Sequence, residues 1–218
     1  GRPPHLSCAA GPGRRRPQKA PDLAMAMRSS TTDAGAKQKV LVVGPCEAGK
    51  TLVANVLAEA VETASEIYRP TVGVRIMEFE TEIRSSQRVT VELWDASGDP
   101  KFSKCWPAIK KDAAGVVLVY NPEKPNSDQE LEQWFGWFPR QMGFAPSQVL
   151  VVQSLRRTDA KRAPLPAKLA QAGVSPAAAV TPDDMAGVRK NFCAFVETVR
   201  QTVLDRQRQE EEDVMKGG

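Results

Sequence analysis

The sequence predicts an α/β fold in which a mixed, mostly parallel sheet is flanked by helices. Short valine-rich apolar runs recur along the chain and alternate with stretches of helical periodicity, a pattern typical of parallel strands joined by crossover helices. Two of these runs are separated only by a short polar turn, which predicts an antiparallel hairpin at one edge of the sheet. The length of 218 residues and the apolar content of 41% suit one globular domain with a sizeable core.

In the first part of the chain, four strands are expected, at 39–43, 74–80, 89–94 and 115–120. The first and last are continuous apolar runs, which indicates burial on both faces of a sheet. The run at 89–94 alternates, so one of its faces is buried. A helix is expected from about Lys50 to Ala64, and the hairpin turn is expected at 85–87.

The second part of the chain predicts a helix at 128–142, which Pro139 breaks, and then a buried strand at 149–152. A short helix near 167–172 and a last strand near 177–180 complete the expected sheet. These elements continue the alternation of strands and helices, so the sheet is expected to be parallel apart from its hairpin.

Residues 181–184 predict the start of the last helix. Thr181 is the expected cap, and a first-turn proline and first-turn acids follow: Pro182, Asp183 and Asp184. Apolar residues at helical spacing follow and form a stripe expected to pack on the sheet: Met185, Val188, Phe192, Val196, Val199 and Val203.

Three segments are expected: a disordered N-terminal extension at 1–36, a folded domain at 37–204, and a charged, flexible C-terminal tail at 205–218. The extension is rich in Pro, Gly, Arg and Ala and has no periodicity. We expect native translation to begin at Met25 or Met27, just before the first strand.

Charge and composition exclude several classes of function. The net charge is +4, but residues 1–40 carry +6, which leaves −2 for the remainder and no basic footprint for nucleic acid. The single histidine, His5, lies in the extension, which removes His-based triads and most zinc sites. The four cysteines form no CxxC pair, which suits a reducing compartment, and no intrinsic membrane anchor is expected.

A phosphate-binding loop is the strongest motif in the sequence. The segment from 44 to 51 fits the pattern G-x-x-x-x-G-K-[ST] at every fixed position: Gly44, Pro45, Cys46, Glu47, Ala48, Gly49, Lys50 and Thr51. It follows an expected strand and opens an expected helix, as a P-loop requires. The glycines let backbone N–H groups surround a phosphate, Lys50 reaches the β- and γ-phosphates, and the Thr51 hydroxyl binds Mg²⁺.

Two further segments fit the same site. Asp95 and Gly98 lie in a D-x-x-G motif directly after the strand at 89–94, where the carboxylate can hold Mg²⁺ and the glycine N–H can meet a γ-phosphate. Thr71 lies in the connection before the strand at 74–80 and offers a hydroxyl to Mg²⁺ when a γ-phosphate is present. Either segment alone is also compatible with an ordinary surface turn.

Together, the three motifs resemble the Ras superfamily of small GTPases over about residues 38–204. The resemblance implies a P-loop NTPase fold of the Ras-like type, with GTP or GDP and Mg²⁺ as ligands. It makes Thr51, Thr71 and Asp95 the metal-binding residues and Gly98 the partner of Asp95 in the second switch. Tyr68 then occupies the position of a tyrosine that covers the nucleotide.

A narrower resemblance is carried by VGPCEAGKT, PTVGVRIMEFE, ELWDASGDPKF and CWPAIKKDAAGVV, at 43–51, 70–80, 92–102 and 105–117. These segments are similar to the Rab-like GTPase subunit of intraflagellar transport complex B. The resemblance implies a protein of cilium or flagellum assembly, located in the cilium and in the cytoplasm near the basal body. It also implies docking on coiled-coil subunits of that complex.

The sequence departs from a working GTPase in its catalytic and base-reading residues. Asp99 stands where Ras-like enzymes have the glutamine that orients water, so we assign Asp99 as the candidate catalytic residue and expect slow hydrolysis. The guanine-reading N-K-x-D motif is missing after the strand at 149–152, and Asp159 is the only nearby substitute. Side chains at Cys46 and Glu47, where glycines are common, can obstruct an arginine finger.

These departures leave several functions open. We favour a GTP-bound assembly subunit with slow or absent intrinsic hydrolysis over a hydrolytic switch activated by a partner. A P-loop ATPase or kinase would need lid arginines, for which Arg156, Arg157 and Arg162 are the candidates. An interaction module that has lost nucleotide binding is disfavoured because Lys50 and Thr51 are present.

An aromatic cluster remains outside this site: Trp134, Phe135, Trp137 and Phe138. Since a helix cannot turn all four to one side, we expect two in the core and two partly covered. The alternative is an exposed aromatic patch for a helical partner, and Trp106 is similarly placed after the D-x-x-G motif.

Overall fold

The computed structural model describes residues 37–59, 70–84, 87–157, 159–181 and 184–216. Its centre is a six-stranded sheet in the order β2-β3-β1-β4-β5-β6. The strands are β1 (Gln38–Val43), β2 (Val74–Glu82), β3 (Arg88–Ala96), β4 (Gly115–Tyr120), β5 (Val149–Ser154) and β6 (Ala178–Val180). Only β2 runs antiparallel to its neighbour, β3, at the sheet edge. The predicted α/β fold with one edge hairpin is confirmed.

The central strands are apolar on both faces because helices cover both faces of the sheet. In β1, Val40 and Val42 belong to one hydrophobic core, whereas Leu41 and Val43 belong to a second core on the opposite face. β4 alternates between the two cores in the same way. The continuous apolar runs seen in the sequence thus reflect two cores that share each strand.

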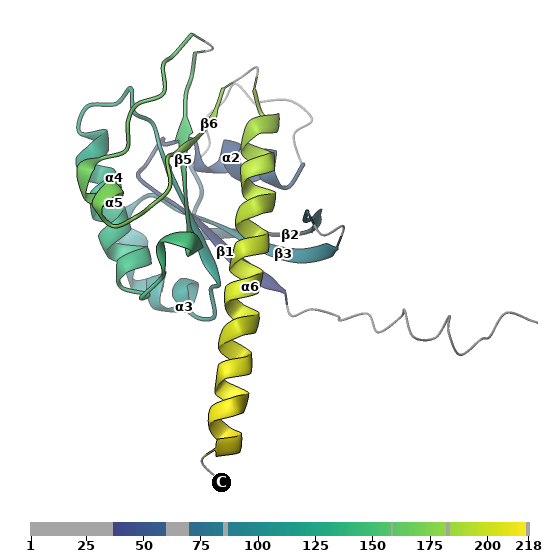
Figure 1. Ribbon diagram of the computed structural model, residues 1–218. Helices are drawn as coiled ribbons and strands as arrows, with labels where there is room; N and C mark the ends of the chain where they lie inside the picture. Colours follow the sequence, from purple (N-terminus) through teal and green to yellow (C-terminus); the bar gives the residue numbers. More distant parts are fainter. Residues whose placement is uncertain (1–36, 60–69, 85–86, 158, 182–183, 217–218) are drawn as a thin grey trace, which may run out of the picture. The chain divides into compact units, whose positions relative to one another are not determined.

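Two layers of helices enclose the sheet (Figure 1). α2 (Lys50–Leu57) and α6 (Ala186–Lys216) pack on one face, and α3 (Trp106–Lys110), α4 (Ser127–Phe135) and α5 (Ala167–Gln171) pack on the other. Short 3-10 turns, η1 (Pro100–Cys105) and η3 (Pro146–Gln148), lie in the connections. The helix expected to reach Ala64 ends at Leu57, and residues 60–64 lie outside the described residues.

The helix expected at 128–142 changes its winding where the proline lies. α4 ends at Phe135 and continues as a π-helical turn, η2 (Gly136–Arg140), which contains the buried Pro139. A wider turn accommodates a residue that has no N–H to donate to the preceding turn. Pro139 therefore does not end the helical segment, which continues through it as a π-helical turn.

The aromatic cluster is divided between core and surface, as the first of the two alternatives predicted. Trp134 and Phe138 are buried, whereas Phe135 and Trp137 are partly exposed. Trp106, from α3, lies between them, with its ring centroid 5.1 Å from those of both Trp137 and Phe138. These residues therefore fasten α3 to α4 and η2 in the second core.

α6 begins later than the sequence predicted. The helix starts at Ala186, and the carboxylate of Asp184 accepts a hydrogen bond from the N–H of Gly187 at 3.1 Å. The Thr181 hydroxyl instead accepts from the N–H of Asp184 at 3.0 Å, so the threonine closes a turn ahead of the helix. The predicted cap at Thr181 was therefore wrong by one turn, and Pro182 and Asp183 lie outside the described residues.

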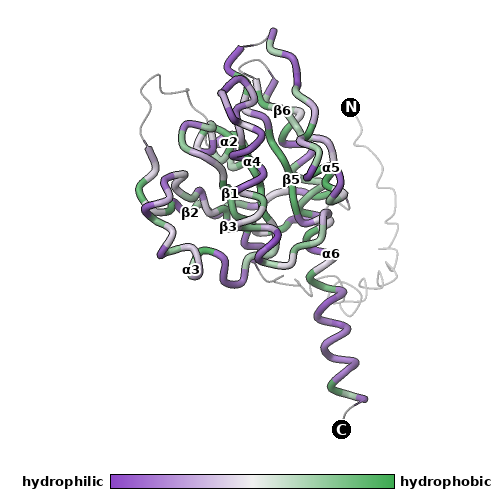
Figure 2. Tube along the Cα trace, turned by 90° about the vertical axis from the view of Figure 1, so that its left-hand side faces the viewer, coloured by the Kyte–Doolittle hydropathy of each residue, from purple (hydrophilic) through white to green (hydrophobic). Residues whose placement is uncertain are grey.

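α6 also runs past the boundary that the sequence placed at residue 204. Its first part buries most of the predicted stripe, namely Val188, Phe192, Val196 and Val199, whereas Met185 and Val203 are only partly buried. Residues 205–216 are exposed and mostly hydrophilic (Figure 2). Side-chain pairs four residues apart support this part, including Arg206 with Glu210 and Gln209 with Asp213. The segment at 205–216, expected as a flexible tail, is thus helical. Within the described residues, no helix is long and apolar enough to cross a membrane.

Candidate nucleotide-binding site

The predicted phosphate-binding loop connects the end of β1 to the start of α2. Gly44 directly follows β1, and Gly49 directly precedes Lys50, the first residue of α2. Gly49 has a φ of 86°, and a Cβ there would lie 2.1 Å from the hydroxyl oxygen of Ser154. No side chain fits this position, because the loop and the end of β5 approach each other too closely.

Lys50 points back into the loop that precedes it. Its ammonium group donates to the carbonyl oxygen of Pro45 at 2.7 Å, and the residue is 7% exposed. Burial lowers the pKa of Lys50 from 10.5 to about 8, although the nearby Asp95 carboxylate acts in the opposite direction. A phosphate at the N-terminus of α2 would therefore meet a poorly hydrated cation.

The three predicted metal-binding residues converge, although they come from different segments of the chain. The Thr51 hydroxyl donates to Asp95 Oδ2 at 2.8 Å and lies 3.0 Å from the Thr71 hydroxyl. Thr71 also donates to Asp95 Oδ2, at 3.4 Å. Two hydroxyl groups and one carboxylate form a set of hard oxygen ligands suited to Mg²⁺.

The surroundings of Asp95 indicate that its carboxylate requires a cation. The residue is 0% exposed, and its Oδ1 atom is buried with no hydrogen-bond partner among the described residues. Burial raises the pKa of Asp95, and the hydrogen bond from Thr51 opposes that effect. Among the described residues, no group of three or more His, Cys, Asp or Glu is arranged to hold a metal ion. Mg²⁺ fits this site because it keeps several waters and binds substrate phosphates beside one or two carboxylates.

Gly98 lies directly against the phosphate-binding loop. A Cβ at this position would be 2.5 Å from Lys50 Nζ and 2.6 Å from the backbone N of Cys46. The N–H of Ser97 donates to the carbonyl of Gly73 at 2.8 Å, which links the D-x-x-G segment to the segment that carries Thr71. The two segments predicted to sense a γ-phosphate are thus connected to each other. Tyr68 lies outside the described residues.

The Asp99 carboxylate contacts Lys101, two residues further along the chain in η1. Oδ1 accepts from the N–H of Lys101 at 3.0 Å, and Oδ2 forms an ion pair with Lys101 Nζ at 2.7 Å. The side-chain hydrogen bond with Lys101 lowers the pKa of Asp99, which makes it a weaker base. In this arrangement, Asp99 caps η1, and both of its oxygens are engaged with Lys101 rather than turned to the phosphate-binding loop by any contact among the described residues.

The rim of the loop carries charge where glycines are common. Cys46 and Glu47 are exposed, and Glu47 adopts a positive φ of 56°. Lys124, from the connection after β4, pairs with the Glu47 carboxylate at 2.8 Å and donates to the Cys46 carbonyl at 3.2 Å. This bridge ties the loop to a segment far away in sequence. No motif in the sequence indicates this role of Lys124.

The base side of the site is organised around Gln153, which is 0% exposed. Its amide nitrogen donates to the Tyr120 hydroxyl at 2.9 Å and to the Ala163 carbonyl at 2.6 Å. Its amide oxygen accepts from the Ala163 N–H at 3.1 Å. Gln153 thus fixes the segment that follows β5, where the guanine-reading motif is missing. The sequence showed only a polar residue at the end of an apolar strand.

Asp159, the possible substitute for the guanine-reading aspartate, has another partner. Its carboxylate oxygens bind Arg157 at 2.9 Å and 2.5 Å, and both residues are exposed. Arg156 and Arg162 are also exposed, as lid residues would be. The side chain near the phosphate-binding loop is that of Ser154, the last residue of β5, which lies beside Gly49.

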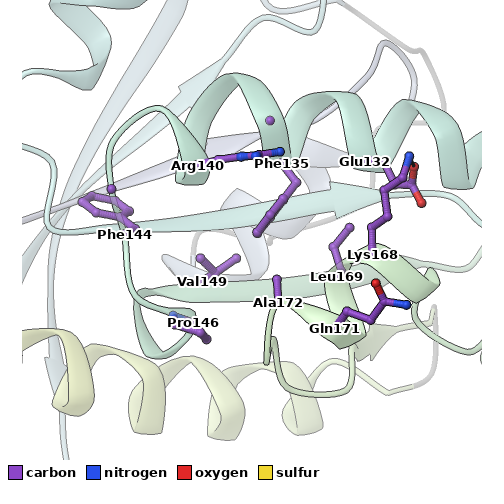
Figure 3. Close-up of a pocket in the computed structure, with 12 residues that line it drawn as sticks. Glu132, Phe135, Arg140, Phe144, Pro146, Val149, Lys168, Leu169, Gln171 and Ala172 are labelled. Carbon is purple, nitrogen blue, oxygen red and sulfur yellow. Dashed lines mark hydrogen bonds and ion pairs between the residues drawn. The ribbon is translucent and has the colours of Figure 1, made fainter.

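A separate cleft of about 520 Å³ lies between α4 with η2 and the segment that carries η3 and α5 (Figure 3). Phe135, Phe144 and Leu169 line it, and Arg140 and Lys168 lie at its margins. Val149, at the start of β5, also contributes to the cleft, whereas Ser154, at the other end of β5, contacts the phosphate-binding loop. The cleft is therefore distinct from the nucleotide site.

The fold and this site define a P-loop nucleotide-binding domain of the small-GTPase class. The family model described as "Ras of Complex, Roc, domain of DAPkinase" matches residues 39–155, more than half of the 218 residues. The chain belongs to this family of Ras-like GTPase domains.

Curated relatives make the similarity narrower. The chain is 46% identical over 120 residues to the intraflagellar transport protein 22 homolog of Bos taurus and 45% identical over 120 residues to that of Homo sapiens. Each match covers 53% of this chain and 64% of the relative, so the chain spans less than two thirds of their length. A Caenorhabditis elegans relative, intraflagellar transport associated protein 2, is 37% identical over 147 residues, covering 52% of this chain and 58% of the relative.

Solved structures agree with this similarity. The GTP-bound crystal structure of T. brucei IFT22/74/81 matches with a TM-score of 0.66 and 29% identity, covering 78% of this chain and 99% of the matched chain. GDP-bound T. brucei IFT22 matches with a TM-score of 0.57 and 28% identity over the same shares. The chain is homologous to intraflagellar transport protein 22, which confirms the resemblance carried by its motifs.

Proposed function

We propose that this chain is a GTP-binding subunit of intraflagellar transport complex B that acts as a nucleotide-dependent assembly partner. The observation that carries the proposal is the convergence of Thr51, Thr71 and Asp95 beside Lys50. In this assignment, the segment 44–51 binds the phosphates, the two threonines and Asp95 hold Mg²⁺, and Gly98 donates its N–H to a γ-phosphate. The matched T. brucei structures are GTP-bound and GDP-bound, which favours a guanine base here as well.

Within this function, we assign slow or absent intrinsic hydrolysis. Asp99 replaces the water-orienting glutamine and is held by Lys101 through both carboxylate oxygens. Cys46 and Glu47 occupy the rim of the site where an arginine finger would enter, and Lys124 fixes that rim. A γ-phosphate that persists suits an assembly partner better than a fast timer.

Partner binding is assigned to the surface next to Thr71. Val72 is 79% exposed and Ile76 is 49% exposed, and both lie on or beside β2, at the edge of the sheet. Thr71 would order this segment through Mg²⁺ only when a γ-phosphate is bound, so its exposed apolar side chains would report the nucleotide state. We propose coiled-coil subunits of the complex as the partners, and the cilium or flagellum and the basal body region as the location.

The test is the nucleotide that the purified chain retains, identified by ion-pair chromatography after denaturation. We expect mostly GTP. Mostly GDP would favour the hydrolytic switch, and ATP or ADP would contradict the proposal. Thr51→Asn, which removes the Mg²⁺-binding hydroxyl group, should lose GTP and, with it, binding to the partner subunits in a pull-down. Partner binding by this variant at wild-type strength would contradict nucleotide-dependent assembly.

A further inference from the structure

Arg75 is a charged residue beside the metal-binding group that no motif in the sequence indicates. In the antiparallel β2–β3 ladder, Arg75 lies directly opposite Asp95. Side chains opposite each other in such a ladder lie on the same face of the sheet and within contact distance. The hairpin therefore places a guanidinium beside the only carboxylate of the group.

The two side chains form a close ion pair with unused hydrogen-bonding capacity. Arg75 Nε lies 3.8 Å from Asp95 Oδ2, which is within ion-pair range but too long for a hydrogen bond. Arg75 Nε and Asp95 Oδ1 are both buried and have no hydrogen-bond partner among the described residues. A modest movement of the guanidinium would satisfy both atoms at once, because its fork matches the geometry of a carboxylate.

A second contact holds the guanidinium in place. Arg75 Nη2 donates to Asn55 Oδ1 at 2.5 Å, and Asn55 lies one turn after Thr51 on α2. The arginine thus joins the strand that follows Thr71, the strand that carries Asp95 and the helix that carries Thr51. Contacts with β3 and α2 therefore hold the guanidinium beside the metal-binding group.

We propose that Arg75 is a resident counter-cation of Asp95, which makes guanine-nucleotide binding by this chain less dependent on Mg²⁺. The inference rests on the proposed function, because it concerns the same site. A buried carboxylate next to nucleotide phosphates needs a positive charge. Mg²⁺ supplies that charge when it is bound, and Arg75 supplies part of it from the chain itself.

Two consequences follow, and they concern different measurements. When Mg²⁺ is removed, Arg75 still neutralises Asp95, so the nucleotide leaves more slowly than it would without the arginine. When Mg²⁺ is present, the guanidinium repels it and competes for Asp95, so a higher Mg²⁺ concentration is needed to occupy the site.

The experiment compares the wild-type chain with Arg75→Gln. Dissociation of a fluorescent methylanthraniloyl derivative of GDP is followed with excess Mg²⁺ and with excess EDTA. The quantity compared is the dissociation rate in EDTA divided by the dissociation rate in Mg²⁺. We expect the ratio to rise about tenfold or more in Arg75→Gln, which corresponds to about 1.4 kcal/mol. Removal of Mg²⁺ accelerates dissociation of the nucleotide, and the Mg²⁺ concentration that suppresses half of this acceleration should be lower in the variant.

Arg88→Gln is the matched control, because it removes an arginine from the same hairpin. Arg88 is exposed and pairs with the exposed Glu80 at 3.6 Å, at the far end of the ladder from Asp95. This variant should keep the wild-type ratio. Arg75→Lys, which keeps the charge without the fork, should give an intermediate ratio and remains informative if Arg75→Gln folds poorly.

Equal ratios in the wild type, Arg75→Gln and Arg75→Lys would overturn the inference while leaving the proposed function intact. Failure of the wild-type chain to bind the GDP derivative even with Mg²⁺ would overturn the proposed function and the inference together. A change of the same size in Arg88→Gln would show a general charge effect and would also overturn the assignment to Arg75.

Discussion

The buried ammonium group of Lys50 predicts opposite pH dependences for folding and for nucleotide binding. Burial lowers its pKa in the nucleotide-free protein from 10.5 to about 8. At about 1.4 kcal/mol per pH unit, this gap is worth about 3 kcal/mol between the two protonation states. The residue is 7% exposed, so screening by solvent removes little of this effect.

The sign for folding follows from proton counting. Below pH 8, Lys50 is charged in both the folded and the unfolded chain, and the folded state bears the full desolvation cost. Between about pH 8 and 10.5, the folded chain has released the proton that the unfolded chain still holds, so the free energy of unfolding rises with pH. This group alone should raise the stability of the nucleotide-free chain by up to about 3 kcal/mol across that window.

Nucleotide binding should change in the other direction. Phosphates require the charged form of Lys50 and raise its pKa, so binding above pH 8 must take up one proton. The association constant should therefore fall by up to about tenfold per pH unit above pH 8.

The assay is urea unfolding of the nucleotide-free wild type and Lys50→Met at a series of pH values from about 7 to 10, together with nucleotide titrations of the wild type. Methionine keeps the aliphatic stem and removes the ammonium group, so the difference between the two chains isolates Lys50 from other titrating groups. We expect the wild type to gain stability relative to the variant as the pH rises. A difference that stays constant over this range would refute the reasoning.

Two other predictions concern the base side and the catalytic position. Gln153→Leu should destabilise the chain by about 3 kcal/mol in urea unfolding, because it leaves the Tyr120 hydroxyl and both backbone groups of Ala163 without their partner. Tyr120→Phe, which removes one bond, should cost about 1 kcal/mol, and a larger loss there than in Gln153→Leu would contradict the network. Asp99→Gln frees the site from the pair with Lys101 and should speed single-turnover GTP hydrolysis, measured as phosphate release, by about tenfold or more. An unchanged or slower rate would show that Asp99 does not limit hydrolysis.

The sheet and the phosphate-binding loop could be predicted because their signals are local. The strands β1, β4 and β5 are valine-rich apolar runs in the sequence, and the expected range 115–120 agrees with β4 at both ends. The loop motif needs fixed residue types at fixed spacing, since the backbone itself binds the phosphate. Thr71 lies shortly before one predicted strand of the hairpin, and Asp95 lies at the end of the other. Their convergence was therefore predictable as well.

Contacts that depend on register could not be predicted. The place of Arg75 opposite Asp95 follows from the pairing of β2 with β3, and a shift of one residue would turn the arginine to the other face. The roles of Gln153 and Lys124 depend on segments that are distant along the chain. The start of α6 was misplaced because Thr181 and Asp184 are both good caps, and only the turn between them decides which one the helix uses.

The residues that agree with the GTPase pattern and those that depart from it serve different parts of the nucleotide. The groups that we assign to the phosphates and Mg²⁺ are present and converge: Lys50, Thr51, Thr71, Asp95 and Gly98. The groups that would activate water or read the base are replaced by residues engaged elsewhere, Asp99 with Lys101 and Asp159 with Arg157. Holding a γ-phosphate and reporting it through Thr71 requires the first set alone, whereas a timer requires both. This division is the physical reason for favouring an assembly partner over a hydrolytic switch.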